Sequence, residues 1–520
     1  MPSRSTDALF QLIKSLEKSE KRNLKLFVNR NSGSESLKSL QLFDALDKMN
    51  EYDDALVLKK APSIKKQQLS NTKALLYRQI LSSLRVLKDE RNTDLQLHEM
   101  LDNARILYNK GLYHQTLKIL ERIKEFARTH HQLTYLQQAL FFEKKIEALY
   151  ITRSLQTRAG ELSAEADTVN KTITNINALS NLTLLLYGWY IQNGHARNEK
   201  DLKTVRQFIE SNLPADTGNS FYEKVYLYQS YVWYAYIKLD FLMYYRYCQK
   251  WVDVFEQNPR MIETETAMYV KGMHNLMSAH FNLLNHDKLA LCIKKFKHFA
   301  QSPLIQDTDN NRIITYVYLY TAVINLHFLE GTFHKGIKMV PFLEKMLVEY
   351  ARYLDRHRVM VFYYKIACLY FGSGDNGKAI DYLNRIINQK DDLRTDLQCY
   401  SRLLHLIAHY ELGNYNLLEY LIKSVYRYMA KMGNLSKVEE EMFRFLRHAF
   451  KFNEKTIKPE FEKLLNKLKK YQNHRLESRA FAYLDVISWL ESKISGINVQ
   501  DVIRKKYLKE QRENNSDKSG

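Results

Sequence analysis

A glycine-rich stretch at Phe371–Ala379 could bind phosphate. It reads FGSGDNGKA, and from Gly372 onward it fits seven of the eight positions of the pattern G-x-x-x-x-G-K-[ST]. Loops of this pattern offer backbone N–H groups and a lysine to phosphates, and a hydroxyl group to Mg²⁺. Here Ala379 replaces the hydroxyl residue, and the preceding MVFYYKIACLYF has the pattern of a helix instead of the required strand. We therefore interpret the stretch as a turn between two helices.

Two histidines have the spacing of a metal site. His405 and His409 are four residues apart, which places them on one face of a helix, as a two-histidine site requires. No acidic third ligand stands out, although Glu411 is near. We interpret the pair as packing residues, and we expect no metal, no cofactor and no enzymatic activity. A catalytic Cys–His pair stays an open alternative, because such partners meet only in space.

The composition favours a helical protein of a reducing compartment. The 520 residues include 16 glycines and 7 prolines, and chains rich in sheets and turns use more of both. The four cysteines form no C-x-x-C pair, so we predict a cytoplasmic protein without disulfides. The 78 basic and 58 acidic residues give a net charge of +20, which favours anionic partners and says nothing about the fold.

One apolar segment, Ile313–Leu329, contains no Asp, Glu, Lys or Arg. Its 17 residues lie at the lower edge of the length that spans a bilayer. It also contains the polar residues Asn325 and His327. We therefore predict a helix buried inside the protein, and the N-terminus has no apolar core of secretory length.

A repeated turn organises most of the chain. An aromatic residue precedes each turn residue by three positions, and another usually follows it by two. The distance from Gly331 to Gly374 is 43 residues, and that from Gly374 to Gly413 is 39. Turns are predicted at Gly111, Leu239, Leu284, Gly331, Gly374 and Gly413, with weaker ones at Arg153–Gly160 and Gln192–Lys200.

The turn pattern resembles the tetratricopeptide repeat, in which two antiparallel helices flank a Gly-Asp or Gly-Asn turn and a small residue follows the glycine by five positions. Gly374-Asp375 precedes Ala379, Gly331-Thr332 precedes Gly336, and Gly413-Asn414 precedes Leu418. The resemblance covers roughly residues 68–496, in units of about 43 residues instead of about 34. It implies an all-α fold, an α-solenoid of about ten antiparallel helix pairs in a right-handed superhelix.

We predict three regions along the chain. Residues 1–66 are expected to form a helical N-terminal cap or adapter, residues 67–508 the tetratricopeptide-like solenoid, and residues 509–520 a disordered polar tail. A DNA-binding helix-turn-helix is the alternative for the N-terminal part, although no recognisable signature supports it. It would use Lys65, Lys66, Lys73, Arg78 and Arg85.

The resemblance implies that the first helix of each unit lines an inner groove. Carried over residue by residue, the groove-facing positions are Tyr226, Gln229, Trp233, Tyr236, Tyr318, Asn325, Phe328, Tyr364, Phe371, Tyr400 and Tyr410. Rigid aromatic side chains often anchor protein interfaces. We therefore expect a non-catalytic scaffold that binds a peptide or helix of a partner protein in this groove, and the sequence leaves the identity of that partner open.

A nucleic-acid-associated regulator is the alternative function. The stretch 455–475 is rich in basic residues that could attract phosphate backbones: Lys455, Lys458, Lys463, Lys467, Lys469, Lys470 and Arg475. More often, such a run forms the solvated face of a helix. Binding through phosphates would weaken steeply with salt, whereas binding through an aromatic groove would change little.

Overall fold

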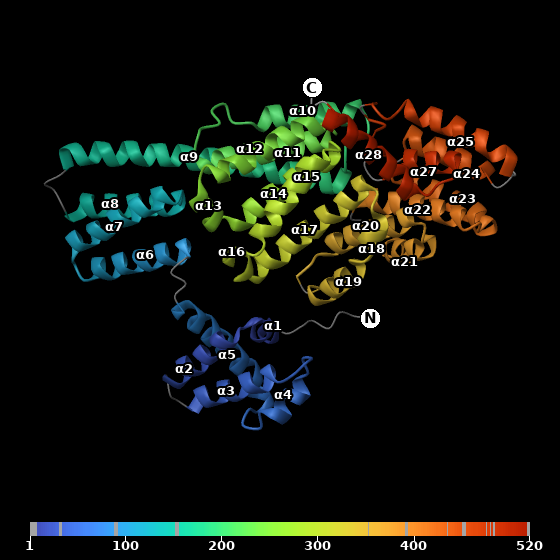
Figure 1. The fold of residues 1–520 in the computed structure, drawn as a ribbon. Helices are drawn as coiled ribbons and strands as arrows, with labels where there is room; N and C mark the ends of the chain where they lie inside the picture. The colour runs from blue at the N-terminus through green and yellow to red at the C-terminus, as the bar shows by residue number, and fades with distance from the viewer. Residues whose placement is uncertain are drawn as a thin grey trace. The chain divides into compact units, whose positions relative to one another are not determined.

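The computed structural model describes residues 8–30, 34–87, 92–150, 155–351, 353–389, 394–433, 435–449, 454–474, 476–478, 480–481 and 484–516. All regular secondary structure in these ranges is α-helical, which confirms the all-α prediction (Figure 1). The chain divides into two compact units, Met1–Asn103 and Ala104–Gly520, and each is described by itself.

The smaller unit is a bundle around its longest helix. Helix α5 (Lys66–Val86) packs against α1 (Ala8–Ser15), α2 (Lys18–Arg30) and α3 (Ser34–Asp47), and α4 (Asp54–Lys60) packs against α3. Phe10, Leu24, Phe43 and Leu76 belong to the shared core. Because α5 contributes to this core, the structural boundary lies at Asn103, inside α6 (Thr93–Asn109), and not at the predicted position 66.

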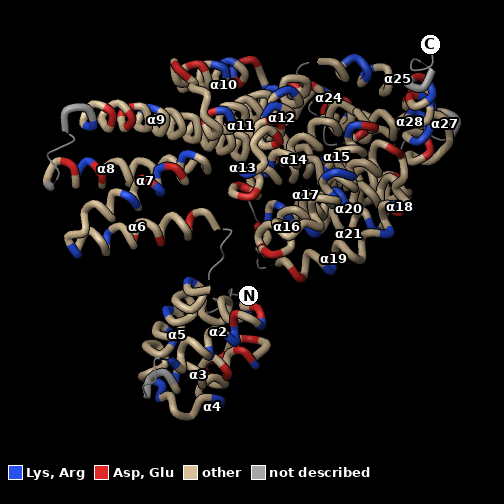
Figure 2. Tube along the Cα trace, turned by 60° about the vertical axis from the view of Figure 1, so that its left-hand side comes forward, with Lys and Arg blue, Asp and Glu red and all other residues tan. Residues whose placement is uncertain are grey.

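The larger unit is an array of helices that pack against their neighbours in the sequence (Figure 1). Lys, Arg, Asp and Glu are interspersed along most of these helices (Figure 2). After α6 come α7 (Tyr113–Thr129), α8 (Leu133–Tyr150), α9 (Leu155–Asn193), α10 (Glu199–Asn212), α11 (Phe221–Ile237), α12 (Phe241–Glu256), α13 (Pro259–Thr264), α14 (Thr266–Asn282), α15 (His286–Phe299), α16 (Pro303–Gln306), α17 (Asp309–Glu330), α18 (Phe333–Ile337), α19 (Val340–Glu349), α20 (Arg356–Ser373), α21 (Asn376–Ile387), α22 (Thr395–Glu411), α23 (Tyr415–Lys431), α24 (Lys437–Ala449), α25 (Glu454–Lys469), α27 (Val486–Ser495) and α28 (Val499–Ser516).

The predicted turns lie where the helices end. Gly111, Leu239, Leu284, Gly331, Gly374 and Gly413 all have positive φ angles, which confirms the six main turns. At Gly374 the N–H of Asp375 bonds to the carbonyl of Tyr370, a common way to end a helix. The side chain of Asp375 then accepts a bond from the N–H of Lys378 and begins α21. FGSGDNGKA is therefore an interhelical turn. The weak turn predicted at Arg153–Gly160 is wrong in its described part, because α9 already runs from Leu155.

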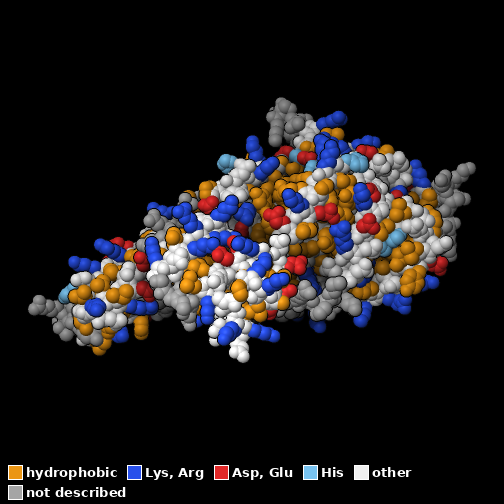
Figure 3. All heavy atoms as spheres, turned by 90° about the horizontal axis from the view of Figure 1, so that it is seen from below, with side chains coloured by type: hydrophobic (Ala, Val, Ile, Leu, Met, Phe, Trp, Pro, Cys, Tyr) orange, Lys and Arg blue, Asp and Glu red, His pale blue; other side chains and the backbone are white. Residues whose placement is uncertain are grey.

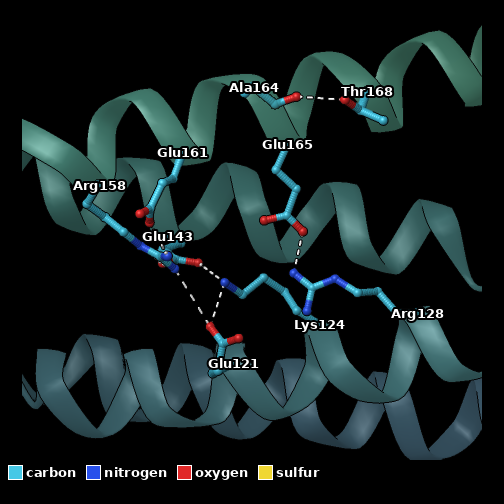
Figure 4. A network of polar contacts seen from close by, with 9 residues as sticks. All are labelled: Glu121, Lys124, Arg128, Glu143, Arg158, Glu161, Ala164, Glu165 and Thr168. Carbon is cyan, nitrogen blue, oxygen red and sulfur yellow. Dashed lines mark hydrogen bonds and ion pairs between the residues drawn. The ribbon is translucent and has the colours of Figure 1, made fainter.

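Helices α7, α8 and α9 enclose a network of charged side chains (Figure 4). The buried ammonium group of Lys124 lies 2.6 Å from carboxylate oxygens of both Glu121 and Glu143. Arg158 of α9 pairs with Glu143 as well, and lies 3.1 Å from Glu161. Because Lys124 and Glu143 each face opposite charges, this interior contains a compensated set of ions that links three helices.

The C-terminal helix α28 runs back over earlier elements and packs against α17 and α20. Arg504 donates a hydrogen bond to the carbonyl of Glu330 at 3.2 Å, and Gln500 accepts one from the N–H of His334 at 2.9 Å. The helix continues through Ser516, so the disordered tail predicted from residue 509 is helical over its described part. An ion pair between Lys509 and Glu513, one helical turn apart, supports this extension.

Helix α17 contains the apolar segment Ile313–Leu329, and Ile313, Val317 and Ile324 are buried in the core, as predicted. Among the described helices it is also one whose length and composition would suffice to cross a membrane.

Candidate functional site

The loop after α9 closes the array onto helices far along the chain. Arg197 donates hydrogen bonds to the carbonyls of Met432, 235 residues later, at 3.1 Å, and of Gly433 at 3.3 Å. The guanidinium carbon of Arg394, at the start of α22, lies 5.6 Å from the ring centroid of Tyr190 in α9. Helices α9, α11, α12, α14, α17, α20 and α22 thus form a closed sequence of contacts, which we call the ring.

Side chains from different parts of the ring approach one another on its inner face. Burial raises the pKa of Tyr187 in α9, and the next largest contribution comes from Asp355, just before α20. Arg358 of α20 lowers the pKa of this hydroxyl group, and Tyr318 of α17 raises it. Trp233 of α11 packs against Tyr187 in a tilted arrangement, with 4.7 Å between the ring centroids. Helices α9, α11, α17 and α20 therefore share one inner surface.

Two lysines on this surface each lie between aromatic rings. The ammonium group of Lys271 in α14 is 5.9 Å from the ring centroid of Trp233 and 5.4 Å from that of Tyr318. His274, one helical turn further, stacks on Tyr318 with 3.9 Å between centroids. The ring of Tyr318 thus lies between a lysine and a histidine of the same helix.

Lys365 of α20 has a similar environment. Its ammonium group is 5.8 Å from the ring centroid of Phe281 and 5.6 Å from that of Phe328. It donates a hydrogen bond to the side-chain oxygen of Asn325 at 2.5 Å. We call this surface the inner patch, and it consists of Tyr187, Trp233, Lys271, His274, Phe281, Tyr318, Asn325, Phe328, Arg358 and Lys365.

The inner patch has an excess of positive charge. Within the described part of the chain, neither Lys271 nor Lys365 has a carboxylate within ion-pair distance, and Arg358 lies 3.6 Å from Asp355. Desolvation lowers the pKa of Lys365 to about 8. The pKa of His274 lies well below its usual value because of burial first, and then because of Lys271, Lys365 and Arg358. The patch therefore holds cations without the partners that cations normally have in a protein interior.

The predicted groove residues divide into two groups. Trp233, Tyr318, Asn325 and Phe328 belong to the inner patch, in which Trp233 and Phe328 are half-buried and Tyr318 and Asn325 are buried. Tyr236 packs next to them against Tyr190. Tyr226 and Gln229 lie on the same helix as Trp233 and are also half-buried.

The other four predicted residues lie in the protein core or near it. Tyr400 is fully buried, and its hydroxyl group donates to Glu439 at 2.9 Å, so it does not line an open groove. Tyr364 and Phe371 are 7% exposed. Tyr410 packs among aromatic rings of α24, α25 and α27. Helices α24, α25 and α27 thus cover the side chains of Tyr400 and Tyr410 on α22.

Sequence reasoning missed Lys271, His274 and Lys365. No glycine marks the turn after α14, so its inner face was not assigned. The signal was present as a helical spacing of polar residues within an apolar helix, because Lys271 and His274 are three positions apart. Lys365 directly follows the assigned Tyr364 and lies on the face that points into the ring.

The predicted basic patch is partly neutralised. Lys463 lies 2.5 Å from Glu460, Lys467 lies 3.0 Å from Glu441, and Lys469 lies 3.2 Å from Glu491. Lys458 and Lys470 are exposed, whereas the side chain of Lys455 and residue Arg475 lie outside the described part.

Two residues of the alternative N-terminal DNA-binding face are also in ion pairs. Lys73 pairs with Asp54 at 3.2 Å, and Arg85 pairs with Asp102 at 3.0 Å.

His405 and His409 lie in the core with 3.3 Å between their Nε2 atoms. Desolvation, followed by His409 and Arg402, lowers the pKa of His405 to about 4. In the part of the chain that the structure describes, no group of three or more His, Cys, Asp and Glu side chains could hold a metal ion. This placement agrees with the interpretation of the pair as packing residues.

No protein-family model matches this chain, and no curated protein matches it in sequence.

Proposed function

We propose that the larger unit is a tetratricopeptide-like α-solenoid that serves as a non-catalytic cytoplasmic scaffold and binds a peptide or helix of a partner protein. One observation carries this proposal: half-buried aromatic side chains from α11, α14 and α17 lie around the two lysines of the inner patch, Trp233 beside Lys271, and Phe281 and Phe328 beside Lys365. Partly exposed aromatic side chains held by rigid helices are typical anchors for a protein ligand.

The repeated turn supports the solenoid part of the proposal. Turn residues with positive φ recur at Leu239, Leu284, Gly331, Gly374 and Gly413, and a helix packs against its neighbour on each side of them. Stacked helical pairs present one face of each first helix to a common surface. Hydrophobic side chains are exposed among Lys, Arg, Asp and Glu on the molecular face drawn in Figure 3.

The alternative proposal, a nucleic-acid-associated regulator, has weaker support. The net charge of +20 favours it. However, Lys463, Lys467 and Lys469 of the basic patch each have a glutamate partner, which reduces the charge that is free to neutralise phosphates.

Co-purification tests the proposed function. Tagged full-length protein would be recovered from native cell extract with and without nuclease, and bound proteins would be identified by mass spectrometry. We expect a defined partner that survives nuclease and moderate salt and is lost with Trp233→Ala. Tyr420→Ala, which removes an aromatic residue that is 69% exposed, is the matched control and should retain the partner. Loss of all partners after nuclease would favour the nucleic-acid alternative instead.

A further inference from the structure

Lys271 and Lys365 of the inner patch are half-buried cations that, among the residues the structure describes, have no carboxylate within ion-pair distance. In the interior around Lys124, each cation faces carboxylates at hydrogen-bonding distance. In the described ranges neither Lys271 nor Lys365 contacts a carboxylate: each lies beside two aromatic rings, and Lys365 bonds to the neutral amide of Asn325. Holding the desolvated cation of Lys365 without an anion lowers the stability of the fold. A ligand that supplies the missing negative charge would remove this penalty.

The surroundings indicate the chemistry of that ligand. The charges of both lysines lower the pKa of the same imidazole, His274, which stacks on Tyr318. A ligand beside Tyr318 would therefore lie within reach of both positive charges. Trp233 and Tyr318 lie beside Lys271, and Phe281 and Phe328 lie beside Lys365. Each positive charge is therefore adjacent to apolar contact area, which suits a chain that alternates acidic and apolar groups.

We infer that the inner patch binds an acidic segment of a partner protein, with carboxylate groups against Lys271 and Lys365 and neighbouring apolar side chains against the aromatic rings. This inference rests on the proposed scaffold function and specifies the partner. A second copy of this chain fits poorly, since it has the same excess of 20 positive charges. A lysine can also bind phosphate as a point charge, so competition by inorganic phosphate and by acetate must separate the two classes of anion.

Selection from random peptides displayed on phage tests the inference with the full-length protein. We expect the selected peptides to be enriched in Asp and Glu next to apolar residues. A labelled peptide from this pool should bind at least about tenfold more weakly to Lys271→Gln and to Lys365→Gln, because each variant removes one charge partner. Lys423→Gln, an exposed lysine 3.6 Å from Glu419, is the control and should bind like the wild type.

The outcomes separate this inference from the proposed function. If peptides require Trp233 but show no acidic enrichment and bind both lysine variants normally, the acidic partner is wrong and the scaffold function stands. If no selected peptide depends on Trp233, the proposed function fails as well. Displacement of the peptide by inorganic phosphate at lower concentration than by acetate would overturn the carboxylate assignment. Thermal unfolding of each variant verifies that lost binding does not reflect lost folding.

Discussion

Lys124 is buried in the larger unit and Lys365 is half-buried, and the two lysines differ in their partners. Lys124 contacts the carboxylates of Glu121 and Glu143, whereas Lys365 contacts the amide of Asn325. We predict that Lys124→Met lowers the free energy of unfolding by about 3 kcal/mol, because Glu143 loses a buried partner. Lys365→Met should raise it by about 1 kcal/mol, because relief from a desolvated charge exceeds the loss of one hydrogen bond.

Urea unfolding of the two variants measures both changes. Lys423→Met is the control for removing an exposed lysine, and its free energy of unfolding should change little. A loss of stability in Lys365→Met would show that this lysine has a structural role that its described contacts do not explain.

The lowered pKa of Lys365 gives a second prediction, a pH dependence of stability. Its pKa is about 8 in the folded chain and 10.5 in the unfolded one. Between these values the unfolded chain binds more protons, so this lysine makes stability rise with pH, by at most about 1.4 kcal/mol per pH unit. The groups around it are Cys368 on its own helix, Asn325 on α17 and His274 on α14.

Denaturant unfolding of wild type and Lys365→Met from pH 7.5 to 10.5 isolates this contribution, because other lysines and tyrosines titrate alike in both proteins. The advantage of Lys365→Met over wild type should shrink as pH rises through this window. An advantage that stays constant would mean that Lys365 is not desolvated.

At the residue scale, the sequence predicted the aromatic part of the candidate site better than its charged part. Trp233 and Phe328 follow from helical register, because each lies at a fixed distance before a recognisable turn. The importance of Lys271 and Lys365 depends on the absence of acidic neighbours, and those neighbours could come from any helix of the ring. Such an absence is visible only after folding has brought the helices together.

At the scale of elements, the turns follow from local sequence even where glycine is missing. Leu284 has a φ of 55° and is 62% exposed, and the side chain of Asn285 then starts α15. An L-residue in this conformation is strained by about 1 kcal/mol or more. We predict that Leu284→Gly raises the free energy of unfolding by about 1 kcal/mol.

Leu291→Gly is the matched control for that prediction. Leu291 is 67% exposed and lies inside α15, where glycine lowers helix stability by about 1 kcal/mol. Chemical denaturation of both variants should therefore give changes of opposite sign. Equal destabilisation would indicate that the turn at Leu284 is not strained.

The position of α28 illustrates what local patterns do not predict. Its sequence is polar and rich in charge, and the fold places it over the turn at Gly331. A Cβ atom at Gly331 would lie 2.5 Å from the backbone nitrogen of Arg504, whereas one at Gly374 would have no neighbour within 4 Å. Both glycines have positive φ and therefore share the same backbone requirement. Of the two, Gly331 also has the steric constraint from α28.

We therefore predict that Gly331→Ala lowers the melting temperature more than Gly374→Ala does. In a chain shortened after Gly496, which lacks α28, the two substitutions should have similar effects, because only the backbone strain remains. Thermal unfolding of the four proteins tests this. A difference that persists without α28 would assign it to another contact of Gly331.

At the scale of the whole molecule, the closure of the ring was not predictable from the sequence. Helical content and repeat length follow from composition and spacing, which are properties of short windows. Closure depends on how small rotations between successive helix pairs add up, and no single window contains them. The contacts that complete it join Arg197 to Met432 and Arg394 to Tyr190. The boundary at Asn103 was not predictable from short windows either, because it depends on the long-range packing of α5 into the core of the smaller unit.

If this closure makes the larger unit cooperative, a substitution at the contact between Arg394 and Tyr190 should destabilise the helices on both sides of the contact. Asp396 holds the buried guanidinium of Arg394 at 2.8 and 2.9 Å. We predict that Asp396→Asn, which leaves this cation without its carboxylate, destabilises the larger unit by about 3 kcal/mol. Hydrogen exchange should then lose protection in α9 as well as in α22, although the two helices are far apart in sequence. Glu210→Gln, which breaks the exposed pair with Arg206, should change neither helix. Loss of protection confined to α22 would mean that the ring contacts form without coupling the helices. The inner patch would then be a surface of independent units, and the distance between Lys271 and Lys365 would not be fixed.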